Sequence, residues 1–535
     1  MYNHIFNSQA KSINRAAGIL AVASLISALL GLLRDRLLAG RFGAGEELDI
    51  YYAAFRIPDF ISMVLVMGAI SAAIIPIFSQ YLAKSEKEAW QYFANLLNLF
   101  LFFLIIISII LIIFVPQILS LIAPGFSGSK KDLTVILTRI MFLSPVLLGI
   151  SNMISGVLRV FKRFMVASAA PIMYNLGIIF GIFFFVPRFG LKGLAWGVAF
   201  GAFLHLLIQL PILFKVGFLP RRIFQFSHPG FLKTMKLTFP RALGLAAVQI
   251  NLVVITAIGS TLASGSIAVF NLANNLRQLP VTLVGVAFST AAFPFLASYF
   301  SKNEKEKFAE EFLSIFKKVL FLMIPLSFLI FVLRAHIIRI ILGTGKFAWV
   351  DTQLTAACLG IFSIGVLAYG LVLLISKTFY AMRNTKIPAI ISLFAVIINI
   401  SLAFLFIWLL SFENYFQSAL INFLDLRGIK ENSVIGLPLA LSLAGIFQLF
   451  LLLFFLRRKI KSFKVKEILK PFVKILTASI FLAFSSWFLL KITANLIGTQ
   501  TFWGLFLQAA VSSGGGILIY FLIVWKLGIF QSSAT

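Results

Sequence analysis

Charged and amide side chains interrupt the long apolar stretches of this 535-residue sequence. In the first stretch Ser24, Ser27 and Arg34 recur at helical spacing, so they share one helix face, and Asp35 and Arg36 follow directly. A second stretch repeats this spacing with Asp49, Tyr52, Arg56 and Asp59. Arginine forms paired hydrogen bonds with phosphate and stays charged in a poor dielectric. The arginines of the two faces could therefore take part in recognition of an anion.

These faces have two interpretations. A charge that faces lipid is costly, so the charged faces are expected to look into a protein cavity. The plainer interpretation is a set of salt bridges that fix helix packing near one membrane interface. The sharper one is a binding site for a charged solute inside the membrane.

A third stretch carries amides in the same pattern. One helix face is predicted to hold four of them, at i, i+3, i+4 and i+7: Asn271, Asn274, Asn275 and Gln278, with Arg277 beside Asn274. Pro58 and Pro280 each lack an N–H group, so each is expected to kink its helix and to act as a hinge. Proline is common in membrane helices, so packing alone is the alternative explanation.

The distribution of acidic residues indicates which charge a bound cargo would carry. No Asp or Glu occurs between Thr134 and Asn303, which leaves Asp35, Asp49 and Asp59 as the candidate intramembrane acids. The candidate arginines slightly outnumber them: Arg34, Arg36, Arg56 and Arg277. A cavity lined by Arg and Asn suits an anionic, hydrogen-bonding cargo such as a pyrophosphate that bears sugars. A cationic drug would instead favour an unpaired acid.

Composition identifies the elements that must position these side chains. The sequence is 61% hydrophobic with a mean hydropathy of +1.03. Apolar runs of about 20 residues recur from end to end, as in no soluble domain. We therefore expect an all-α polytopic membrane protein with about fourteen transmembrane helices. The single cysteine, Cys358, and four scattered histidines exclude an internal disulfide and a metal cluster, so we expect no metal and no cofactor.

Charge and repetition predict the topology. The net charge of +29 fits basic cytoplasmic loops and anionic membrane lipids as partners, and not nucleic acid. Basic loops alternate with loops that carry few charges, which places both termini in the cytoplasm. The segment from Arg457 to Lys474 is the most basic. The segment that begins at Pro76 returns at Pro294, 218 residues later. An offset of six helices predicts parallel repeats. The expected domains are therefore 1–230 and 231–460, two pseudo-symmetric six-helix lobes, and 461–535, the last two helices.

Several motifs together carry a resemblance to a known family. They are Leu30-Gly31-Leu32-Leu33-Arg34-Asp35, Phe42-Gly43-Ala44-Gly45, Ala54-Phe55-Arg56-Ile57-Pro58, Gly68-Ala69-Ile70-Ser71-Ala72-Ala73, Ala123-Pro124-Gly125-Phe126, Leu262-Ala263-Ser264-Gly265-Ser266 and Gly345-Lys346-Phe347. With them the sequence resembles the MurJ/MviN family of lipid II flippases, in the group that includes the MATE exporters. The resemblance implies a cationic cavity between two lobes and a groove for a polyprenyl tail at the last two helices. Arg34, Asp35 and Asp49 match functional positions of the family, whereas Ala28, Ser62 and Asn275 stand where members often have arginine.

The expected function is that of a flippase and not an enzyme. It would move undecaprenyl-pyrophosphate-linked peptidoglycan precursor, lipid II, across the bacterial cytoplasmic membrane by alternating access. Three groups of residues would serve it: Arg34, Arg36, Arg56 and Arg277 for the pyrophosphate; Asn271, Asn274, Asn275 and Gln278 for sugar or peptide; and Asp35, Asp49 and Asp59 for positioning the arginines and responding to protons or membrane potential. Proteins of cell-wall synthesis are candidate partners.

Other functions stay open at this point. The nearest alternatives are a transporter of another polyprenyl-linked glycan and a MATE-like multidrug antiporter. An integral glycosyltransferase would need acids and a metal or base site in a sizeable external loop. Asp425 and Glu431 lie in the longest loop, but nothing near them resembles a catalytic set. A passive scaffold would not require a charged cavity.

Overall fold

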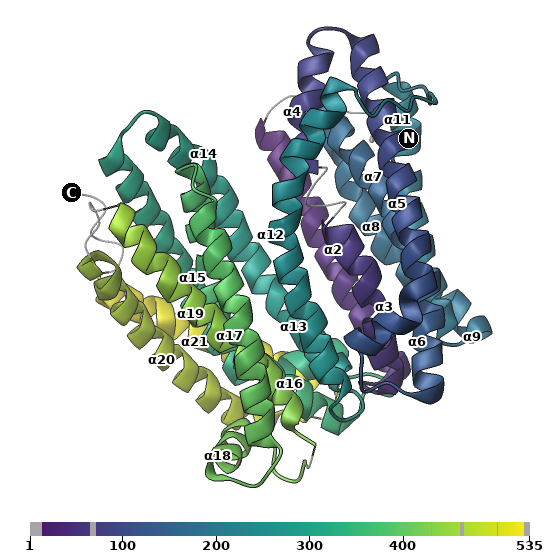
Figure 1. The fold of residues 1–535 in the computed structure, drawn as a ribbon. Coiled ribbons are helices and arrows are strands. Elements are labelled where there is room, and N and C mark those ends of the chain that lie inside the picture. Colours follow the sequence, from purple (N-terminus) through teal and green to yellow (C-terminus); the bar gives the residue numbers. More distant parts are fainter. Residues whose placement is uncertain (1–12, 65–70, 430, 461–464, 500, 529–535) are drawn as a thin grey trace. The chain divides into compact units, whose positions relative to one another are not determined.

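The computed structural model describes residues 13–64, 71–429, 431–460, 465–499 and 501–528 (Figure 1). Within these ranges all regular secondary structure is helical, which confirms the all-α prediction. Twelve described helical stretches are long and apolar enough to cross a membrane. The predicted count of fourteen stays a prediction. Part of the basic run from Arg457 to Lys474 lies outside the described residues, at 461–464.

The chain forms two compact units, residues 1–267 and 268–535. The three-part division predicted at 230 and 460 stays a prediction, because it rests on repetition and not on compactness. Unit 1 contains α2 (Ile13–Phe42), α3 (Glu46–Ile61), α4 (Ser71–Leu82), α5 (Glu86–Ile122), α6 (Gly128–Met141), α7 (Leu143–Val160), α8 (Phe164–Phe180), the π-helix η2 (Gly181–Phe185), α9 (Val186–Phe189), α10 (Lys192–Leu207), α11 (Leu210–Lys215) and α12 (Pro229–Ser260).

Small residues bring the helices of unit 1 close together. A Cβ atom on Gly177 of α8 would overlap the backbone of Gly201 on α10, and Gly181 and Gly197 meet in the same way one turn along. Close backbone contact of this kind is how membrane helices gain packing energy without a hydrophobic driving force. Helix α8 packs on its other side against α2, so the glycines fix α8 where its polar side chains face α2.

A polar network joins α7 to α10. Ser151 lies 2.7 Å from Nδ1 of His205, the side chain of Gln209 donates to Ser151 at 2.6 Å, and Ser155 donates to Gln209 at 2.7 Å. All four side chains are buried. The role of this network is to satisfy buried polar groups between two helices.

The connection from α11 to α12 lies against α5. The Asn95 side chain donates to the carbonyl of Gln225 at 2.9 Å and accepts from its N–H at 2.6 Å. Asn98 donates to the carbonyl of Arg221 at 2.6 Å. His228 then caps α12, because its Nδ1 accepts from the N–H of Gly230 at 3.1 Å. Two asparagines and a histidine therefore determine where α12 begins.

Unit 2 is built around one long central helix, α16. Its helices are α13 (Ser266–Pro280), which begins at the end of unit 1, the π-helix η3 (Val281–Val286), α14 (Ala287–Ser301), α15 (Lys305–Leu342), α16 (Trp349–Ala381), α17 (Lys386–Leu410), α18 (Tyr415–Leu424), the 3-10 turn η4 (Ser433–Ile435), α19 (Gly436–Lys459), α20 (Val465–Leu496) and α21 (Phe502–Lys526). Helix α16 packs against α14, α15 and α19, while α20 and α21 pack together and against α15. The longest predicted loop contains the short helix α18, which Asn414 caps by accepting from Gln417 N–H.

Candidate functional site

The first charged group lies where α2 meets α8. Arg34 donates to Oδ1 of Asp35 through Nε at 3.0 Å and through Nη2 at 2.8 Å. Its Nη1 donates to Oδ1 of Asn175 on α8 at 3.3 Å. The side chain of Asp35 is 6% exposed and that of Arg34 is 22% exposed. A guanidinium group carries five N–H donors, so about two remain without a partner among the described residues.

Asn175 is itself held in one orientation. Its Nδ2 donates to the carbonyl and the hydroxyl of Ser27, both at 3.3 Å, and to the carbonyl of Pro171 at 3.2 Å. Because Nδ2 is engaged in this way, Oδ1 must point to Arg34. The guanidinium plane is therefore fixed from two sides before any ligand arrives, which reduces the entropy that binding must overcome.

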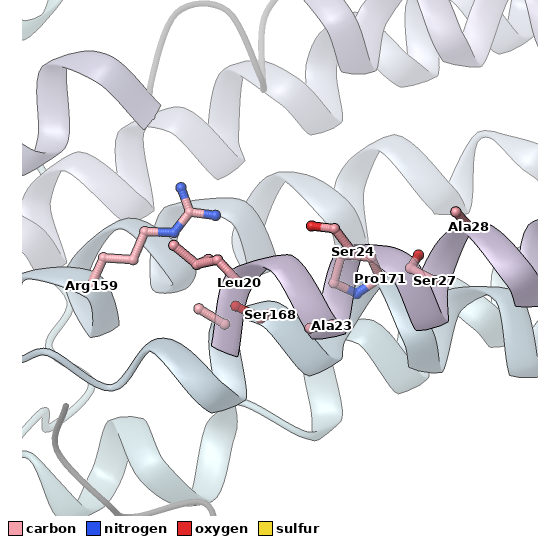
Figure 2. Close-up of a pocket in the computed structure, with 9 residues that line it drawn as sticks. Leu20, Ala23, Ser24, Ser27, Ala28, Arg159, Ser168 and Pro171 are labelled. Carbon is pink, nitrogen blue, oxygen red and sulfur yellow. The ribbon is translucent and has the colours of Figure 1, made fainter. Parts of the chain in front are cut away.

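The predicted polar face of α2 lines a cavity. Figure 2 shows Ser24 and Ser27 of α2 beside Pro171 and Ser168 of α8, at a cavity of about 330 Å³. Arg159, in the last turn of α7, completes the lining. The cavity thus lies along the contact between α2 and α8, called here the α2–α8 seam, and Arg34 lies further along the same contact.

Helix α3 sends its charged residues in different directions. Arg56 is buried and donates through Nε to Oγ1 of Thr256 on α12 at 2.6 Å. Asp59 is half-buried and makes no hydrogen bond or ion pair with a described residue. Tyr52 is half-buried, and its hydroxyl has no hydrogen-bond partner among the described residues. The predicted face therefore combines one arginine bound to a neighbouring helix, a buried tyrosine hydroxyl without a hydrogen-bond partner among the described residues, and one acid without such a partner.

Asp49 belongs to a junction of loops. Its Oδ2 accepts the N–H of Gly265 at 2.7 Å and lies 3.9 Å from Nζ of Lys130. Gly265 has φ +89°, and a Cβ atom there would overlap the carbonyl of Ala44. At the same junction the N–H of Gly125 donates to Oγ of Ser260 at 3.1 Å. Three motifs that are far apart in the sequence thus meet at one end of unit 1, where Asp49 stabilises their contact.

In unit 2 the arginine and the amides have different environments. Arg277 is 7% exposed, and its guanidinium carbon lies 4.7 Å from the ring centre of Phe362 and 4.3 Å from that of Tyr369, both on α16. Aromatic faces of this kind stabilise a cation. Its Nε and Nη1, and Oδ1 of Asn274, are buried without a hydrogen-bond partner among the described residues.

Along the predicted amide face of α13, the side chains become more exposed toward the end of the helix. Asn271 is buried, Asn274 and Asn275 are half-buried, and Gln278 is exposed. Arg36, at the other predicted site, is half-buried. The structure therefore groups Arg34 with Asp35, and Arg277 with two rings, and gives Arg56 and Asp49 separate partners. Sequence reasoning does not identify six of their partners: Asn175, Thr256, Lys130, Gly265, Phe362 and Tyr369.

Each of the two predicted hinge prolines precedes a widened turn. After Pro58 the backbone is π-helical at 62–64, and after Pro280 it is π-helical over η3 (Val281–Val286). A proline leaves a carbonyl without its usual partner, and a π turn is a common local response that recurs at functional sites. The hinge role of Pro58 and Pro280 stays a prediction.

Arginines and acids buried among apolar, membrane-crossing helices are typical of a multi-pass membrane transporter. The profile of a family described as lipid II flippase MurJ matches residues 38–507. The chain therefore belongs to the lipid II flippase MurJ family.

Individual relatives agree with this assignment. A protein of Buchnera aphidicola subsp. Acyrthosiphon pisum (strain APS), described as a probable lipid II flippase MurJ, is 32% identical over 384 residues, which are 71% of this chain and 75% of the relative. A solved structure of lipid II flippase MurJ in an inward closed conformation matches with a TM-score of 0.75 and 27% identity, over 95% of this chain and 98% of that one. An inward-facing MATE family multidrug transporter matches with a TM-score of 0.66 at 15% identity, over 84% and 98%, which shows the common fold alone.

Proposed function

We propose that this protein carries lipid II, the undecaprenyl-pyrophosphate-linked peptidoglycan precursor, from the inner to the outer leaflet by alternating access, without chemical change. The observation that carries the proposal is Arg34, whose guanidinium is fixed by Asp35 and Asn175 and keeps about two free N–H donors. It lies between the same two helices, α2 and α8, that line the cavity further along. Two such donors match the oxygens of a phosphate group.

The other predicted residues take further roles in binding and moving the substrate. Arg36, Arg56 and Arg277 add positive charge for the pyrophosphate. Contacts to sugar or peptide come from Asn271, Asn274, Asn275 and Gln278. Asp35 and Asp49 hold their neighbours in place, Asp59 is available to respond to protons or membrane potential, and Pro58 and Pro280 act as hinges.

We place the protein in the bacterial cytoplasmic membrane with both termini in the cytoplasm. Twelve apolar helices within the described part of the chain support a multi-pass membrane protein, and the alternation of basic loops supports this orientation. The precursor lipid is the principal partner, anionic lipids contact the basic loops, and proteins of cell-wall synthesis are the proposed recipients.

A leaflet-translocation assay tests the proposal. Purified protein is reconstituted into vesicles that contain labelled lipid II, and an impermeant reagent measures how much headgroup reaches the opposite leaflet. The wild type should increase the rate over protein-free vesicles, and Arg34→Ala should not. No difference between wild type and protein-free vesicles, under an imposed membrane potential as well as without one, would contradict a flippase.

The alternative substrate is another polyprenyl-linked glycan, or a cationic drug as in MATE exporters. Asp35 is already paired with Arg34, which disfavours a cation at this point. The same vesicles with a different polyprenyl pyrophosphate glycan, or with a cationic dye, separate these substrates by their relative rates.

A further inference from the structure

The cavity beside α2 has a charged end that the proposed function does not use. It encloses about 330 Å³, near the lower limit of about 300–1,000 Å³ for ligand pockets. Apolar groups form part of its wall, and the polar contributors are Ser24 and Ser27 of α2, Ser168 of α8 and Arg159 of α7. In Figure 2 the hydroxyl of Ser24 and the guanidinium of Arg159 lie on the same side of α2.

Arg159 is a cation without a counterion. It is exposed and makes no hydrogen bond or ion pair with a described residue. Neither α7 nor α8 contains an acid, because the sequence has none between Thr134 and Asn303. The full set of guanidinium donors is therefore available to an anion at this end of the cavity.

The hydroxyl groups extend this anion site toward Arg34. Ser168 donates its hydroxyl hydrogen to the carbonyl of Phe164 at 2.7 Å, so its oxygen can accept from a cationic donor but has no hydrogen left for a phosphate. Ser27 accepts from Asn175, which in turn accepts from Arg34. Ten residues separate Ser24 from Arg34 on α2, which is about 15 Å along the helix. Two arginines thus mark the two ends of one polar seam.

We propose that Arg159, with the hydroxyl of Ser24, forms a second phosphate-binding site that receives the pyrophosphate of the lipid-linked substrate before Arg34 does. The inference rests on the proposed function, which it deepens by naming a first contact. The shared chemistry is a lipid phosphate, whose source is either this substrate or an anionic phospholipid. The polar path from Arg159 to Arg34 favours the substrate as the source, because a phospholipid headgroup would need only the end at Arg159.

Three variants of the full-length protein test the site. Arg159→Gln removes the charge and keeps a polar side chain of similar reach. Lys162→Gln is the matched control, since Lys162 is exposed three positions away and does not line the cavity. Its positive φ of +58° strains lysine and glutamine alike. Arg159→Gln combined with Ala28→Arg returns a cation to the same cavity from α2, because Ala28 also lines it.

Binding of lipid II, of undecaprenyl pyrophosphate and of phosphatidylglycerol is measured by native mass spectrometry for each variant. We expect Arg159→Gln to weaken both pyrophosphate lipids about tenfold or more, since a hydrogen bond to a charged group is lost. Phosphatidylglycerol binding should change little, Lys162→Gln should match the wild type, and Ala28→Arg should restore part of the affinity.

The same measurements distinguish a failure of the second phosphate site from a failure of the proposed function. If Arg159→Gln binds lipid II like the wild type while Arg34→Ala does not bind it, the second site is wrong and the proposed function stands. If phosphatidylglycerol alone loses affinity, the site belongs to membrane phospholipid and the inference is overturned. If undecaprenyl pyrophosphate binding depends on Arg159 but lipid II never binds, the phosphate site is supported and the proposed function fails.

Discussion

Replacement of Arg34 by glutamine is expected to have two effects together: loss of lipid II transport and a lower stability of unit 1. Asp35 is 4% exposed and accepts two hydrogen bonds from Arg34. Removal of one partner from a buried ion pair costs about 3–5 kcal/mol, because the remaining charge is uncompensated. Loss of transport by this variant alone would therefore mix lost stability with lost binding.

The double variant Arg34→Gln/Asp35→Asn separates the two effects. It removes both charges and keeps polar groups of similar volume, and such neutral replacements of buried pairs are often neutral for stability. Two hydrogen bonds to the substrate phosphate, each worth about 1.5–3 kcal/mol, are still lost. Their sum, about 3–6 kcal/mol, corresponds to a fall of about 10²- to 10⁴-fold in lipid II affinity.

Thermal unfolding in detergent and lipid II binding are measured on the same preparations. The double variant should melt close to the wild type and bind far more weakly, while Arg34→Lys should fold but lose the planar two-pronged contact. A double variant that is as stable as the wild type and transports lipid II at the wild-type rate would refute the role assigned to Arg34.

Three further predictions concern other contacts. Gly265→Ala should lower the free energy of unfolding by about 1–3 kcal/mol for its positive φ, and by more through a clash with the carbonyl of Ala44. Gly428→Ala, with φ +88° and open space around it, should show only the strain of the positive φ, and thermal melts compare the two variants. Asn175→Leu should leave the protein folded but weaken lipid II binding, because Arg34 loses its second anchor; unchanged affinity would contradict this. Burial lowers the pKa of His228, so the unfolded chain binds more protons in acid and stability should fall as the pH drops below about 6.5. His228→Asn, which keeps an acceptor for the helix start, should flatten this dependence in melts between about pH 7.5 and 5.

The helices and one polar face follow from the sequence because they depend on local spacing. Apolar length and 3.6-residue periodicity are properties of consecutive residues, so the all-helical fold and the alignment of Ser24 and Ser27 with Arg34 could be predicted. Hydropathy could not predict the turn at Phe142 that divides α6 from α7, or the π turns after the prolines, because those depend on packing.

Partners from distant helices lie beyond such reasoning. Asn175 is 141 positions from Arg34, and a lone asparagine in an apolar helix has many possible partners. The sequence predicts that Arg277 acts with the amides of its helix, but its guanidinium lies against Phe362 and Tyr369. Its position six residues after Asn271 does turn it away from the amide face, and this was the one local signal of a separate environment.

The junction around Asp49 also has a consequence for biosynthesis. Gly265 follows Asp49 by 216 positions, so at about 5–20 residues per second its amide is made roughly 10–45 s after the carboxylate. During that interval the nascent chain has inserted most of unit 1 without the loop that completes this end. Lys130 is made much earlier and can hold the acid until then. The last step in closing unit 1 is therefore the arrival of α12 and the glycine turn that follows it, and truncation before that turn should yield an inserted but incomplete unit.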